Sequence, residues 1–130
     1  MRRAHLPALA MALCVVGHAP AARSAPANTL KDLWAYLGRC VTIEGASPGA
    51  AGSEVTVLFS VKRDGSLNGK PRIAHSRLLG SEEDQRSFIG AALGAVSRCL
   101  PADITDGLGG AIAGRPLRVR LTSGKPERSL

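Results

Sequence analysis

The clearest alternation of apolar and polar residues in the chain lies in Glu54–Leu67. Its apolar residues recur at every second position as Val55, Val57, Phe59 and Val61. A period of two places such side chains on one face of a strand, and β-branched and aromatic residues suit a pleated sheet. The Asp64-Gly65 pair then favours a tight turn, because glycine reaches positive φ without a Cβ clash. Leu58 points to the opposite face, so we expect a central strand that is covered on both sides.

Two further strands complete the sheet. Leu67–Ala74 is predicted to be the second strand, and Pro71 restricts it to an edge or a bulge because proline cannot donate to a ladder. His75–Gly80 is expected to form a loop. Arg115–Thr122 is predicted to be the last strand, with Leu117, Val119 and Leu121 facing inward and Arg118 and Arg120 facing outward.

Two amphipathic helices accompany these strands. Asn28–Val41 repeats the apolar residues Leu30, Leu33, Trp34 and Leu37 at spacings of three and four, and Asn28 or Thr29 can cap its start. The second helix begins at the capping hydroxyl of Ser81, continues through Glu82, Glu83 and Asp84, and ends at about Cys99. The glycine-rich Gly45–Ser53 is expected to be a flexible connector, and Ala102–Gly114 a loop with a short helical turn at Asp103–Leu108.

The order helix, strand, strand, helix, strand predicts an α+β fold with a three-stranded antiparallel sheet packed against two helices. The spatial order of the strands is then second–first–third, because an antiparallel last strand must pair with the first. Both outer strands are edges. Leu117–Leu121 has no interior proline, so its backbone stays free to pair.

The N-terminal residues have the three parts of a secretory signal. Two arginines come first, the apolar run Leu6–Val16 follows, and small residues offer candidate cleavage sites at Ala19-Pro20-Ala21, Ala22-Arg23-Ser24 and Ala25-Pro26-Ala27. The apolar run is short for a membrane span, so an uncleaved anchor is the alternative rather than the expectation. We therefore expect an exported protein with a signal peptide at 1–27, one domain at 28–122 and a disordered tail at 123–130.

Export changes the charge of the mature chain. Removal of Arg2, Arg3 and Arg23 with the signal lowers the formal net charge from +7 to +4. A nucleic-acid surface would combine a clustered basic face with stacking aromatics, and the mature chain has few aromatics. The composition argues against nucleic-acid binding, and the sequence has no legible metal-ligand cluster or cofactor motif.

Cysteine usage fits export. Cys14 lies in the signal, which leaves Cys40 and Cys99, and an even count in an oxidising compartment predicts one disulfide. The alternative from the enzyme class is a small secreted hydrolase or thiol enzyme that uses Cys40 or Cys99 with His75. A third alternative is a secreted inhibitor or envelope stress factor that shares the fold.

Three segments resemble the C-terminal domain of the TonB/TolA family of periplasmic proteins: Val55–Leu67, the helix ending at Cys99-Leu100-Pro101, and the closing Gly114–Val119. The positions of the two cysteines are similar to those of the TolA branch. The resemblance covers about Leu30–Thr122. It implies a domain without catalysis or cofactor that binds partner proteins in envelope transport or envelope integrity. The chain lacks that family's long spacer and clear membrane anchor, so a free-standing periplasmic adaptor is expected.

The last strand is the expected partner-binding site. Its backbone would pair with a strand from an envelope protein (an outer-membrane receptor, a lipoprotein or a Tol/Ton-type component) while its arginines select acidic side chains. The candidate residues are Arg115, Leu117, Arg118, Val119, Arg120 and Leu121. The alternative is that the arginines only protect an edge strand from aggregation. Proline at Val119 is the expected test, since it should disturb edge pairing.

Overall fold

The computed structural model describes the pair Val16–Gly17 and residues 25–123. In chain order the elements are α1 (Leu30–Cys40), the 3-10 helix η1 (Pro48–Ala50), β1 (Glu54–Phe59), β2 (Arg72–Arg77), α2 (Glu82–Arg98), α3 (Asp106–Ile112) and β3 (Leu117–Thr122). The three strands form one antiparallel sheet in the order β2-β1-β3. The predicted α+β class and strand order are confirmed, and α3 is a complete helix where only a short turn was predicted.

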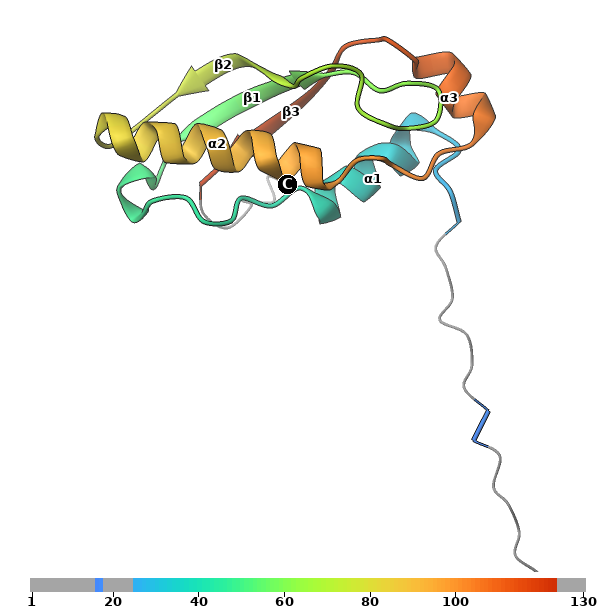
Figure 1. Ribbon diagram of the computed structural model, residues 1–130, viewed down its shortest axis with the longest axis horizontal. Helices are drawn as coiled ribbons and strands as arrows, with labels where there is room; N and C mark the ends of the chain where they lie inside the picture. The colour runs from blue at the N-terminus through green and yellow to red at the C-terminus, as the bar shows by residue number, and fades with distance from the viewer. Residues whose placement is uncertain (1–15, 18–24, 124–130) are drawn as a thin grey trace, which may run out of the picture.

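The core lies on one face of the sheet, where both long helices pack (Figure 1). Val55, Val57 and Phe59 of β1 are buried there, as the period of two predicts. Their neighbours on β3 are the inward-facing Leu121, Val119 and Leu117. The helices add apolar residues at helical spacing, namely Leu33, Leu37, Phe88, Ala92, Ala95 and Val96.

The expected cover on both faces of β1 is wrong. Leu58 is only partly buried, and its cross-strand neighbours are Arg72 and Arg118. The polar Thr56 and Glu54 share its face. One aliphatic side chain among charged neighbours cannot hold a second layer, because burying the arginines would strip their water without supplying partners. This face of the sheet is therefore open.

The second strand lies later in the chain than predicted. Leu67 forms only an isolated bridge with Val61, across a turn in which Gly65 has φ 87°. β2 begins at Arg72, directly after Pro71, and a bulge opposite Thr56 and Val57 leaves Ala74 as the extra residue. His75 is therefore a strand residue and not part of a loop. The residues around Leu67 belong to the tight turn, so the continuous pairing of β1 with β2 begins only after Pro71.

The segment expected to be a flexible connector is packed against α2. Its backbone at Ser47 donates to Ser87 Oγ over 3.0 Å, and the side chain of Ala50 is fully buried. Ser53 is buried too, and its hydroxyl accepts the Leu79 N–H at 2.9 Å. The small side chains that made the segment look flexible allow it to lie close against the helix.

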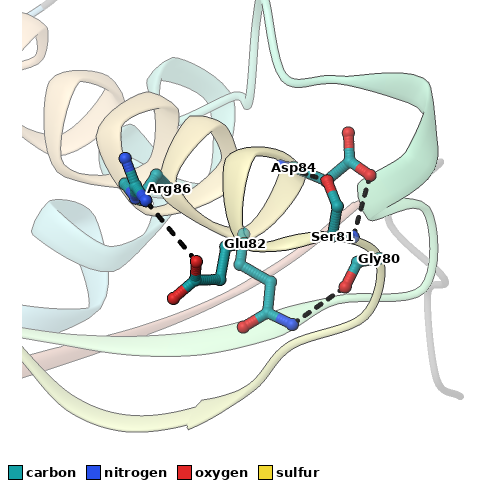
Figure 2. Close-up of polar contacts among 6 residues, drawn as sticks. Gly80, Ser81, Glu82, Asp84 and Arg86 are labelled. Atoms are coloured by element: carbon teal, nitrogen blue, oxygen red, sulfur yellow. Dashed lines mark hydrogen bonds and ion pairs between the residues drawn. The ribbon is translucent and has the colours of Figure 1, made fainter.

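The predicted cap of α2 is confirmed. Ser81 and Asp84 face each other in Figure 2 and form a capping box. Ser81 Oγ accepts the Asp84 N–H at 3.2 Å, and the Ser81 N–H donates to Asp84 Oδ2 at 3.0 Å. The hydrogen bond from the Ser81 backbone is the largest cause that lowers the pKa of the Asp84 carboxyl. Glu82 also forms a salt bridge with Arg86 at 3.8 Å, and because both side chains are exposed it contributes little to the stability of the fold.

Backbone hydrogen bonds join Ala27 and Ser123, near the two ends of the range 25–123, to the rest of the domain. Ala27 is buried; it donates to the Asp103 carbonyl and accepts from the Thr105 N–H, both at 2.9 Å. The rest of the expected signal, apart from residues 16–17 and 25–26, lies outside the described residues. Ser123 continues the β3 ladder through its N–H to the Ser53 carbonyl at 2.9 Å, and the expected tail beyond it lies outside them as well.

Candidate functional site

The outer edge of β3 offers backbone groups without partners. The bond from Ser123 N to Ser53 O sets the phase of the β1–β3 ladder. Because hydrogen-bonded and non-hydrogen-bonded pairs alternate in an antiparallel ladder, Leu117, Val119 and Leu121 bond inward to β1. The N–H and C=O groups of three other residues then point away from the sheet, those of Arg118, Arg120 and Thr122. Across residues 25–123, no other segment hydrogen-bonds to them.

A groove of about 430 Å³ runs beside this edge. One wall is β3 from Arg118 to Thr122, and the other is the C-terminal half of α1 with the segment that follows it. Trp34 lines the groove and is 38% exposed, which is unusual for the one tryptophan of a small domain. Ile43 and the half-buried Val119 add further apolar surface. An edge strand beside an apolar groove is the arrangement that strand addition requires.

The structure brings together part of the predicted partner-binding set. Arg118, Val119, Arg120 and Leu121 all line the groove. Leu117 and Leu121 have buried side chains, so they act in the core rather than on a partner. Arg115 lies before the strand, where its N–H closes the end of α3 by donating to the Ile112 carbonyl at 2.9 Å. It does not share the groove.

The expectation that all the strand's arginines select acidic partners needs correction at Arg120. Its guanidinium already holds Glu54 through two hydrogen bonds, from Nε to Oε1 at 2.5 Å and from Nη2 to Oε2 at 2.7 Å. This hydrogen bonding is the largest cause that lowers the pKa of the Glu54 carboxyl. Arg118 forms no ion pair with any described residue. Arg118 is therefore the arginine of β3 whose guanidinium is free to bind an acidic side chain of a partner.

Sequence reasoning missed Trp34 as a groove residue. It counted Leu30 and Trp34 in one apolar stripe with Leu33 and Leu37, but only the last two are buried. Leu30 is 43% exposed, and it lies one helical turn from Trp34. The spacing carried no signal of this, because Leu30 and Trp34 keep the same helical periodicity as the buried pair and differ only in the neighbours that cover them after folding.

The groups of the thiol-enzyme alternative are not assembled. Cys40 and Cys99 form the predicted disulfide, with their Cα atoms 5.8 Å apart. His75 pairs with Thr56 and projects from the open face of the sheet, opposite the two helices at whose C-terminal ends the cysteines lie. The part of the chain that the structure describes contains no cluster of three metal-ligating side chains. Within the same residues, no helix is long and apolar enough to cross a bilayer.

Residues 23–125 match the family described as "Uncharacterised conserved protein UCP034077". The chain belongs to this family. Membership in UCP034077 contradicts the resemblance to the TonB/TolA C-terminal domain, which rested on a turn, an amphipathic helix and a closing strand that many α+β domains share. The UCP034077 match begins before Ala27, in agreement with the place of that residue in the core. No curated protein and no solved structure matches the chain.

Proposed function

We propose that this chain is a protein-binding module that takes an extended segment of a partner as a fourth strand along β3. The single observation that carries the proposal is the phase of the β1–β3 ladder. That phase leaves the N–H and C=O groups of Arg118, Arg120 and Thr122 directed outward, next to a groove. Main-chain hydrogen bonds of this kind supply affinity in strand addition, while pockets for alternate side chains supply specificity.

The two faces of β3 define the partner's pattern. Side chains of an added strand point alternately to the two faces of the sheet. One set would enter the groove beside Trp34 and Ile43, which favours apolar residues. The other set would lie next to Arg118 on the open face, which favours acidic residues. A partner segment that alternates apolar and acidic residues satisfies both.

The opposite edge of the sheet is less suited to pairing. β2 has a bulge at Ala74 and begins directly after Pro71. Bulges and prolines are the features that protect natural edges from pairing. β3 also follows a proline, Pro116, but it has no bulge, and its six residues pair with β1 without interruption.

The compartment is part of the proposal. A Cys40–Cys99 disulfide is typical of proteins in oxidising compartments, and the N-terminal sequence has the pattern of a secretory signal. We place the module in the periplasm, where its partner would be another exported protein of the cell envelope. Fractionation of cells, with the intact mass of the recovered protein, tests this placement.

The strand-pairing test uses a synthetic peptide in which valine alternates with glutamate. Amide hydrogen exchange is measured with and without the peptide. The amides of Arg118, Arg120 and Thr122 should gain protection on binding. The amides of Val119 and Leu121, which already bond to β1, should change little. Protection that falls instead on the β2 edge, or on neither edge, contradicts the proposal.

Two variants at one position separate backbone pairing from charge. Arg118→Pro removes an outward N–H and the guanidinium, whereas Arg118→Ala removes the guanidinium alone. We expect Arg118→Pro to abolish peptide binding and Arg118→Ala to weaken it modestly. Ser76→Pro is the matched control, because the same alternation directs its N–H outward from the other edge. If Arg118→Pro folds normally and binds as well as Arg118→Ala, edge pairing is wrong.

Val119→Pro, the change favoured by sequence alone, is not informative. The Val119 N–H points toward β1, so proline there would break the sheet rather than test the edge.

A further inference from the structure

The open face of the sheet is strongly basic. The register places three rows of side chains across it: Arg72, Leu58 and Arg118; His75, Thr56 and Arg120; and Arg77, Glu54 and Thr122. Both long helices lie on the other side (Figure 1). Four arginines and one histidine therefore surround one carboxylate on a surface that no described element covers. We name this set of nine side chains the open sheet face.

Most of this charge is not neutralised. Glu54 is engaged by Arg120, and Arg77 and His75 lie near enough to lower its pKa further. Arg72, Arg77 and Arg118 form no ion pair within residues 25–123. The four arginines against one glutamate leave the open sheet face with a formal charge of +3 when His75 is neutral.

The charges are spread out rather than convergent. Arg72 and Arg118 lie on the two outer strands, about 10 Å apart at the backbone from the usual strand spacing. Arg77 lies about 13 Å from the row of Arg72, counted along β1 from Glu54 to Leu58. Such spacing is too wide for a single phosphate to contact all of them. It suits a surface that presents many phosphates side by side.

We propose that the open sheet face binds the surface of an anionic phospholipid membrane through the lipid phosphates. Arginines near such a surface each contribute attraction without having to insert. A protein partner is less suited to this face, since it has no aromatic anchor and its one aliphatic side chain, Leu58, is partly buried. Single-stranded nucleic acid would call for stacking aromatics, which these nine residues lack.

A hollow of about 250 Å³ extends the basic surface at one end. Leu58 and Arg72 line it together with Lys70 and Asn68. Lys70 is exposed and forms no ion pair with any described residue. A lipid phosphate that reaches the Arg72 row would therefore meet a second cation.

The test is co-flotation of the mature protein with vesicles. One set consists of phosphatidylcholine alone, and the other of equal parts phosphatidylcholine and phosphatidylglycerol. We expect binding only to the second set, weakened by salt as the screening length shortens. The double variant Arg72→Gln/Arg77→Gln should lower the binding constant about 25-fold, from about fivefold for each arginine.

A matched control removes the same charge from the helical side. Arg39→Gln/Arg86→Gln alters two exposed arginines on α1 and α2, so its net charge equals that of the Arg72→Gln/Arg77→Gln variant. This control should keep most of the binding. Equal losses in the two double variants, or equal binding to both vesicle sets, overturn the proposal. Stronger dependence of DNA-duplex binding than of vesicle binding on Arg72 and Arg77 overturns it too. The substituted arginines lie on β2, so strand pairing at β3 can succeed or fail independently.

Discussion

The disulfide should supply a large share of the stability of this domain. Cys40 and Cys99 are separated by 59 positions, and the chain-entropy treatment of a loop of this length gives about 4 kcal/mol. Small domains have a total stability of about 5–15 kcal/mol, so the loss in the double variant Cys40→Ala/Cys99→Ala is severe. For a domain of roughly 100 residues, it corresponds to a fall in Tm of about 15–30 °C.

The assay is urea unfolding at neutral pH, followed by Trp34 fluorescence and far-UV circular dichroism. The double variant should unfold at lower urea with a larger m-value, because an unfolded chain without the crosslink exposes more surface. Wild type under reducing conditions is the control and should reproduce the variant's stability. A loss below about 1 kcal/mol would refute the reasoning, since it would show that closing this loop does little to the unfolded ensemble. Free thiols in the mature, unreduced protein would remove its premise.

Two further predictions concern the capping box and the chain start. The lowered pKa of Asp84 means that its carboxylate stabilises the fold above the ordinary aspartate pKa, and that this contribution is lost as pH falls through the still lower folded value. Asp84→Asn should therefore be less stable than wild type at neutral pH in urea titrations, and the gap should close below about pH 4; a gap independent of pH contradicts this. At the N-terminus, cleavage after Ala27 would remove a buried residue with two backbone hydrogen bonds, so the intact mass should place the mature start at or before Ala27. A chain that begins at Asn28 and unfolds at the same temperature as a longer one would contradict that interpretation.

The candidate site was predictable only in part. The alternation in Leu117–Thr122 and the antiparallel order were enough to predict β3 as a free edge, and both are confirmed. The pattern could not say which backbone groups point outward, because inward and outward amides look alike in sequence. That phase follows from the pairing of Ser123 with Ser53, two residues that are far apart in the sequence. Because of this phase, proline at Arg118 tests edge pairing, whereas proline at Val119 does not.

By itself, the sequence determined the features that are encoded within a few neighbouring residues. The period of two in β1, the capping hydroxyl of Ser81 and the even cysteine count each predicted a local structure or a bond that the fold contains. Tertiary structure decided which surfaces are covered. Whether Leu58 is buried, whether Trp34 joins the core and whether Arg120 is free depend on distant groups: the helices, the sheet face and Glu54. Burial and pairing are properties of the neighbours that a residue acquires on folding, and a one-dimensional pattern does not contain them.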